Sequence, residues 1–203
     1  MRYYLYKMTS DYGAAPCVCG GVLSLAICKP RIRSAAGKDD VVIGFAGMTL
    51  GDGAYAGRII YIAKITEKLE CGDYYRANGV YVNRCDQIYE WKGETLVQKV
   101  NRWHNADSVS ADIGSPPYNK ANVLVSGKGK FRCLRHKAWP KEMGCEIFKT
   151  LGRSHRVNHD EATLKKSRKL WIVRSRRRTP PKIGYLYKAN PWLGVPEKGR
   201  ITR

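Results

Sequence analysis

The sequence predicts an α+β domain built mainly from antiparallel β-strands, with short helices and a basic C-terminal extension. Three observations lead to this prediction. Short runs rich in Val, Ile and Tyr recur along the chain, most clearly at residues 3–8, 41–45, 59–65 and 122–126. Clusters of Gly, Pro, Asp and Ser separate these runs, as turns do. The densest cluster of cations comes late, between Lys165 and Arg178.

The first half of the chain predicts strands joined by turns. Residues 3–8 alternate aromatic, aliphatic and polar side chains, which favours a first strand. Residues 9–16 predict a turn, and residues 22–28 a short apolar strand. Pro30 can begin a short helix, because its missing N–H costs nothing at the first helical position. Residues 41–45 and 58–67 then predict an antiparallel hairpin with a long, glycine-rich connection.

The second half is less regular. Residues 69–83 predict a short helix or an ordered loop, and strands are expected at 122–126 and 130–134. A helix can begin at Asp160, where acidic residues favour the helix dipole. The apolar quartet 170–173 lies inside the basic run and predicts a strand that docks on the body. We place the β-rich domain at residues 1–157 and the basic extension, packing on or wrapping it, at 158–203.

The charge balance predicts a polyanionic partner. The 203 residues hold 37 Lys and Arg against 17 Asp and Glu, a formal net charge of +20. Self-repulsion of this size destabilises a compact chain, and phosphate contacts relieve it. Nucleic acid, whether DNA or RNA, is therefore the first expected partner. The longest apolar stretches are about six residues, far short of the ~20 that a membrane span needs, so no membrane partner is expected.

The cysteines and the N-terminus predict a cytoplasmic protein. The first residues contain no apolar core long enough for a signal peptide. Seven scattered cysteines, an odd number, do not form a disulfide framework. Cys17 and Cys19 lack the second matching pair of a zinc site, and no nucleotide-cofactor motif is present, so we expect neither a metal nor a cofactor.

Candidate nucleic-acid contacts are cations beside turns and aromatic side chains. Arg can bind phosphate through two parallel hydrogen bonds, and aromatic rings stack on bases. A base would stack on Tyr12 or Trp103. The alternative for the cations near Lys29 and near Arg153 is an ordinary basic surface, and for the run from Lys165 to Arg178 it is a disordered arm. The expected phosphate contacts are Lys29, Arg31, Arg33, Arg153, Arg156, Lys165, Lys166, Arg168, Lys169, Arg174, Arg176, Arg177 and Arg178.

Three residues are candidates for acid–base chemistry or for hydrogen bonds to a base edge. His104 and His155 can change charge near neutral pH. Asp107 could orient His104, although most such pairs are surface residues. Asp11 follows the first strand and is either a site carboxylate or a turn residue that bonds its own backbone.

Several segments also carry a family resemblance. They are Asp11–Pro16 after the first strand, Leu25–Arg33, Asp40–Gly44 and Ile60–Leu69 with Tyr74 and Tyr75, and later Asp86–Tyr89, Val123–Ser126 and Gly152–His155. Their order resembles the nucleotide modification associated domain 2 family over residues 1–157. Two places depart from its pattern: Asp39 replaces a glycine before Asp40, and Ser154 replaces a glycine before His155. The resemblance implies a link to modified bases in phage or bacterial nucleic acid, and no established reaction.

A weaker resemblance extends to PUA-like folds, including ASCH and EVE domains. It implies a small curved sheet or barrel that holds an extruded base in a pocket. We therefore expect a nucleic-acid-binding module associated with base modification, which recognises a modified base or nucleotide in phage or bacterial DNA. Two alternatives stay open. One is an enzyme, a transferase or hydrolase, that acts on a nucleotide or base. The other is a basic phage protein that binds a host factor.

Overall fold

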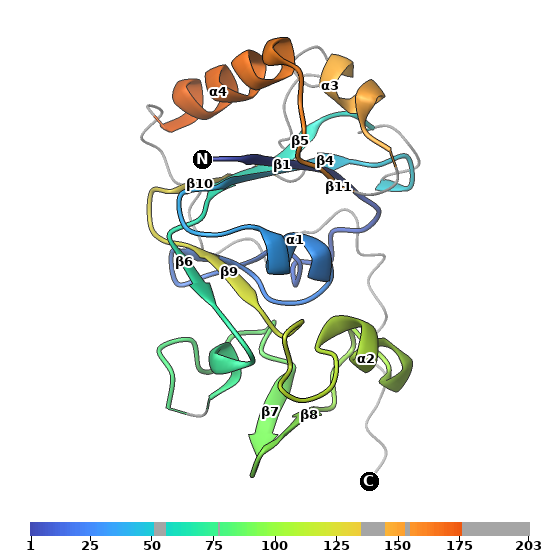
Figure 1. Ribbon diagram of the computed structural model, residues 1–203, viewed down its shortest axis with the longest axis vertical. Coiled ribbons are helices and arrows are strands. Elements are labelled where there is room, and N and C mark those ends of the chain that lie inside the picture. Colours follow the sequence, from blue (N-terminus) through green and yellow to red (C-terminus); the bar gives the residue numbers. More distant parts are fainter. Residues whose placement is uncertain (51–55, 77, 135–144, 153–154, 176–203) are drawn as a thin grey trace, which may run out of the picture.

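The computed structural model describes residues 1–50, 56–76, 78–134, 145–152 and 155–175. Its strands form three sheets (Figure 1). The five-stranded sheet has the order β10 (Phe131–Cys133), β5 (Ile59–Lys64), β4 (Val41–Ala46), β1 (Tyr3–Met8) and β11 (His155–Arg156). The four-stranded sheet has the order β2 (Cys17–Cys19), β3 (Val22–Leu25), β9 (Val123–Ser126) and β6 (Glu67–Leu69). β7 (Tyr89–Lys92) and β8 (Thr95–Gln98) form a separate hairpin.

The helices are short except for the last. They are α1 (Pro30–Ala35), α2 (Val109–Asp112), α3 (Cys145–Thr150) and α4 (Glu161–Ser175), with 3-10 turns at Asp73–Tyr75 and Ala106–Ser108. The predicted α+β class is confirmed, and so are the first strand, the helix that starts at Pro30 and the antiparallel β4–β5 hairpin. β1 and β4 pair in parallel, while the other strand pairs of the described residues are antiparallel.

Layers of apolar side chains hold the sheets together. α3 and α4 lie over one face of the five-stranded sheet, and α1 lies with the four-stranded sheet on its other face (Figure 1). Side chains of β1 enter both layers, because successive side chains of a strand point to opposite faces. Tyr3 and Leu5 join the layer under the helices, while Tyr4 and Tyr6 join the layer between the sheets. A third cluster lies between the four-stranded sheet and the β7–β8 hairpin.

Of the two expected architectures, a curved sheet or a barrel, the barrel is wrong, because the sheets remain open within the described residues. The expected strand at residues 170–173 is also wrong, because these residues are helical and belong to α4. The Asp160 carboxylate accepts a 2.7 Å hydrogen bond from the N–H of Thr163 and so caps the start of α4. Leu, Lys and Arg are also strong helix formers, and this propensity outweighs the local apolar run.

The end of the chain is described in part. Leu164 of α4 packs against the apolar layer of the five-stranded sheet. The expected wrapping segment at residues 185–203 lies outside the described residues. None of the helices in the described ranges combines the length and the apolar character that a membrane crossing requires.

We expect that packing requires a glycine at position 44, in the middle of β4. A Cβ at this position would lie 2.7 Å from the sulfur of Met8 and closer still to the Tyr61 ring. We expect Gly44→Ala to lower the free energy of unfolding by about 1–3 kcal/mol, as overpacked cores do. Urea denaturation measures the loss. Gly37→Ala is the matched control, because a Cβ there meets nothing within 4 Å; equal losses in both variants would contradict this account.

Candidate functional site

The candidate site begins where the chain leaves β3 and enters α1. Cys28 and Lys29 both have left-handed backbone conformations, with φ of 59° and 48°. Residues other than glycine rarely adopt this region, and they keep it only where neighbouring groups hold them. Here the Cys28 N–H donates to Asp112 Oδ1 at 2.9 Å, and the Cys28 carbonyl accepts from Arg33 Nε at 2.7 Å. The Cys28 backbone is thus held from both sides.

Arg33 and Asp112, which hold Cys28, form a buried ion pair. The distance from Arg33 Nη2 to Asp112 Oδ1 is 2.6 Å, and the Arg33 side chain is 0% exposed. Its other N–H groups donate to the carbonyls of Lys120, Asn122 and Asp112. The expectation that Arg33 contacts phosphate is therefore wrong: every direction of its guanidinium is occupied by protein. Its role is to join α1 to the segments before β9.

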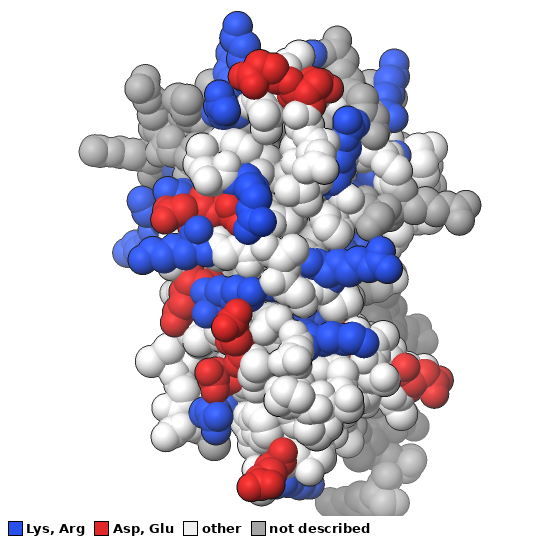
Figure 2. Space-filling model, in the orientation of Figure 1, with Lys and Arg blue, Asp and Glu red and all other residues white. Residues whose placement is uncertain are grey.

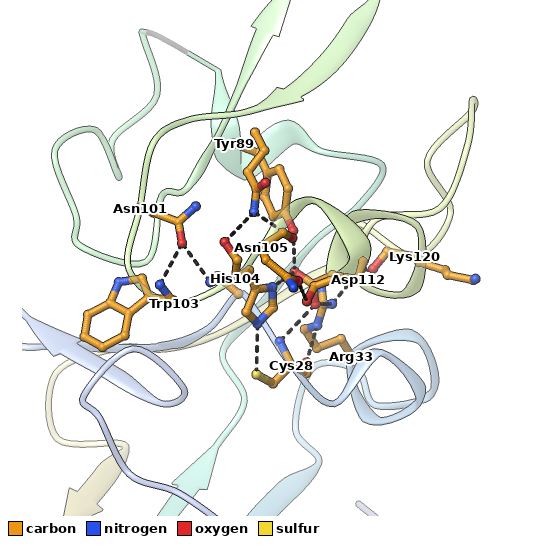
Figure 3. Close-up of polar contacts among 12 residues, drawn as sticks. Cys28, Arg33, Tyr89, Asn101, Trp103, His104, Asn105, Asp112 and Lys120 are labelled. Carbon is orange, nitrogen blue, oxygen red and sulfur yellow. Dashed lines mark hydrogen bonds and ion pairs between the residues drawn. The ribbon is translucent and has the colours of Figure 1, made fainter.

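His104 lies against the same ion pair, in a loop after β8 (Figure 3). Its Nε2 is 3.3 Å from the Cys28 sulfur, and its Nδ1 is 3.6 Å from Asp112 Oδ2. Tyr89 donates a 3.0 Å hydrogen bond to the same Asp112 oxygen. A thiol, an imidazole and a carboxylate therefore follow one another in a line. This order of groups is the one that nucleophilic catalysis uses.

Local hydrogen bonds fix the loop that carries His104. The side-chain oxygen of Asn101 accepts from the N–H groups of Trp103 at 2.8 Å and His104 at 2.9 Å. Gln98 Nε2 donates to the His104 carbonyl at 3.0 Å. Asp107, expected to orient His104, is exposed and accepts from the side chain of Asn105 instead. The carboxylate beside His104 is that of Asp112.

Burial and nearby charges set the pKa of the Cys28 thiol. Its pKa is raised, first because the thiol is partly buried and then because the Asp112 carboxylate is near. Lys29 and Arg33 oppose this shift with their positive charges. The thiol therefore keeps its proton at neutral pH in the unliganded protein.

A second group of residues, which we call the basic rim, consists of Lys29, Arg31 and His155. Lys29 Nζ lies 5.1 Å from the centre of the Tyr6 ring, and Arg31 is exposed. His155 lies on β11, and the pKa of its imidazole is lowered, first by burial and then by the charges of Arg31 and Lys29. No carboxylate among the described residues forms an ion pair with Lys29 or Arg31. Lys29 and Arg31 of the basic rim therefore carry positive charge that no ion pair among the described residues offsets.

Asp11 lies in the interior, near the hydroxyls of Tyr6 and Tyr61. It is 2% exposed, in the turn after β1. The hydroxyls of Tyr6 and Tyr61 hydrogen bond to each other at 2.9 Å. Burial raises the pKa of both hydroxyls, and the Asp11 carboxylate adds to the shift. The Asp11 carboxylate is therefore a buried group near the Tyr6 and Tyr61 hydroxyls, and not part of an exposed turn.

The remaining predicted contacts are spread over the molecule. Tyr12 is 52% exposed, and Trp103 is half-buried beneath Arg102, whose Cζ is 4.3 Å from the centre of a Trp103 ring. Arg156 is half-buried and donates to the carbonyl of Asn158. Figure 2 shows Lys and Arg side chains over the middle and upper parts of one face, with Asp and Glu among them.

The cations of α4 lie away from the basic rim. α4 covers the opposite face of the five-stranded sheet from α1 (Figure 1). Four of its predicted phosphate contacts are exposed, namely Lys165, Lys166, Arg168 and Lys169. Arg153 and residues 176–178 lie outside the described residues, as does the side chain of Arg174.

Cys28, Asp112 and Tyr89 were missed by the sequence analysis. Cys28 sits within a segment that was singled out, but its chemistry depends on two partners 76 and 84 residues away. No spacing rule connects such positions. In the described part of the chain, no three His, Cys, Asp or Glu side chains converge on a point where a metal could bind.

Loss of the Arg33 charge is expected to destabilise the fold strongly. Arg33→Met would leave the Asp112 carboxylate buried without its cation, which typically costs about 3–5 kcal/mol. Arg31→Met is the matched control, two residues earlier and exposed, and it should change the free energy of unfolding by less than about 0.5 kcal/mol. Urea denaturation of both variants checks this; similar stabilities would show that the pair is dispensable.

The comparisons with known proteins give one match. The family model described as nucleotide modification associated domain 2 matches residues 1–182. The match extends past residue 157, where the sequence analysis placed the domain boundary, and includes α4. No curated protein and no solved structure matches the chain. With 182 of its 203 residues matched, the chain belongs to the nucleotide modification associated domain 2 family.

Proposed function

We propose that this protein binds nucleic acid, DNA in the first place, and that it recognises a modified base or nucleotide there. The observation that carries the proposal is the basic rim of Lys29, Arg31 and His155, which has no carboxylate partner among the described residues. Membership in a family associated with nucleotide modification supports the same direction. The net charge of +20 favours association with any polyanion.

The arrangement suggests a division of roles within the proposed interface. Phosphates would bind at Lys29 and Arg31, where a charge-assisted hydrogen bond is not in competition with a protein carboxylate. Tyr12 is exposed enough to offer its ring to a base. The cations of α4 would bind backbone on the far face of the sheet and add affinity without selectivity. A nucleic-acid strand that contacted both the basic rim and the cations of α4 would pass around the β11 edge of the five-stranded sheet.

Material that co-purifies with the protein tests the modified-base proposal. We expect an absorbance ratio at 260 and 280 nm that indicates bound nucleic acid, and nucleoside mass analysis should show modified nucleosides enriched over total cellular nucleic acid. Bound nucleic acid with ordinary nucleoside composition would leave the binding proposal standing and remove the modified-base part.

Binding of labelled DNA should depend steeply on salt, and the dependence should trace to the basic rim. Each cation that neutralises a phosphate steepens the slope of log affinity against log salt by about 0.9. Lys29→Ala and Arg31→Ala should each make the slope shallower by roughly this amount, measured by fluorescence anisotropy. Lys92→Ala on β7 is the control, since Lys92 is exposed and lies near Glu90. An absence of binding at low salt, or equal effects of all three variants, would refute the proposal.

Affinity for DNA should also rise as the pH falls. In the free protein the pKa of His155 is lowered from its ordinary value of 6.5 by burial and by Arg31 and Lys29. A bound phosphate would offset these cations and raise the pKa, so binding takes up a proton. Affinity should therefore increase as pH drops through the pKa of the bound state and level off below that of the free state. The DNA affinity of His155→Asn, measured over the same pH range, should lack this pH dependence. An unchanged pH profile would exclude His155 from the interface.

A further inference from the structure

We propose that Cys28 is the nucleophile of an acyl-transfer site, with His104 as its general base and Asp112 as a positioning residue. The expected substrate is an ester or amide carbonyl carried by a phosphate-bearing molecule, such as a nucleotide or a nucleic-acid strand. The nature of this carrier rests on the proposed function. The thiol chemistry rests on the geometry of Cys28, His104 and Asp112 alone.

The contact between Cys28 and His104 has the direction that the reaction needs. His104 Nε2 is 3.3 Å from the Cys28 sulfur, while Nδ1 faces the Asp112 carboxylate at 3.6 Å and has no hydrogen-bond partner among the described residues. An imidazole between a thiol and a carboxylate is best satisfied with its proton on Nδ1. Nε2 is then the acceptor for the thiol proton. Catalytic hydrogen bonds are often long before the substrate binds, so 3.6 Å is compatible with an orienting role.

The state of the thiol at rest explains why a base is required. Burial and the nearby Asp112 raise the pKa of Cys28, so the sulfur carries a proton before the reaction. The thiolate is the reactive form of cysteine. A base in contact with the sulfur therefore has to remove the proton as the new bond forms, and His104 is in that position (Figure 3).

The protein also holds Cys28 in a conformation that it would not adopt alone. Its φ of 59° is left-handed, and the buried pair of Arg33 and Asp112 bonds its N–H and its carbonyl. Left-handed backbone in a residue other than glycine is rarely populated and tends to occur at functional sites. The same ion pair fixes the carboxylate that faces His104, so one structural unit places all three groups.

The proposed step conserves every atom and electron pair. As the Cys28 sulfur attacks the carbonyl carbon, its proton passes to His104 Nε2. The bond from that carbon to the leaving oxygen or nitrogen breaks, and Nε2 gives the proton to the leaving atom. The product is a thioester on Cys28. Water or a nucleobase amine then attacks the thioester, loses a proton to Nε2, and the released sulfur takes that proton back.

The neighbouring charges indicate what carries the acyl group. Lys29 follows Cys28 directly, and Arg31, two residues after Lys29, is exposed. A phosphate bound at these two cations would lie along the same short stretch of chain as the thiol. An acyl group on a neutral carrier would gain nothing from them, and this favours a nucleotide or nucleic-acid carrier.

Nitrogen NMR of His104 tests the proposal without any substitution. With ¹⁵N-labelled histidine, the neutral His104 ring should carry its proton on Nδ1. A proton on Nε2 would overturn the proposal, because that nitrogen could not accept the thiol proton. A purely structural contact makes no such demand on the tautomer.

Acylation with p-nitrophenyl acetate gives the chemical test. We expect an acetyl group on the Cys28 peptide by mass spectrometry, which hydroxylamine removes as it does from a thioester. His104→Asn should slow this acetylation at least tenfold. Acetylation of Cys71, an exposed thiol of the same chain, should be unchanged and serves as the internal control. Equal rates at Cys28 in the native protein and in His104→Asn would overturn the proposal.

A second variant guards against a folding artefact. Cys28→Ser should lack the labile adduct and keep the thermal unfolding midpoint of the native protein. If Cys28→Ser is unstable, the rate of Cys28 acetylation in the native protein, compared before and after urea unfolding, decides instead: the folded protein should react faster. Failure of DNA binding with intact Cys28 acylation would refute the proposed function alone, and the reverse result would refute this inference alone.

Discussion

The buried ion pair between Arg33 and Asp112 is the interaction on which the organisation of the molecule depends. It joins α1, the end of α2 and the segment before β9. A guanidinium with no access to water needs a full set of acceptors, and the carbonyls around it supply them. These hydrogen bonds hold the three segments against one another. They also leave one oxygen of Asp112 for Tyr89, beside His104.

The sequence predicted the elements whose signals are local. Alternation predicted β1, two β-rich runs around a glycine-rich loop predicted the β4–β5 hairpin, and Pro30 marked the start of α1. The parallel pairing of β1 with β4 was not predicted, since nothing in either strand indicates which neighbour it takes. The four apolar residues 170–173 suit both a strand and a helix, so a strand prediction there has no firm local basis. Helix propensity and the Asp160 cap decided that case.

At the candidate site, too, the local signals were predictable from the sequence and the long-range contacts were not. Arg33 was identified as important, but its charge suggested the surface, while the fold buries it as a partner for a distant carboxylate. His104 was identified from its chemistry, and its orienting carboxylate was sought nearby at Asp107. The true neighbours, Cys28 and Asp112, come together only when the loop after β8 folds onto α1. Long-range contacts of this kind leave no periodicity in a single sequence.

The placement of β1 has a consequence for the synthesis of the chain. β1 is bonded on one side to β4 and on the other to β11, which is made far later in the chain. Ribosomes add ~5–20 residues per second, so on the order of ten seconds separate the appearance of β4 from that of β11. During this time one edge of β1 has no partner, and unpaired edges invite association with other chains. A nascent chain of this protein is therefore expected to engage chaperones until its β11 segment has emerged.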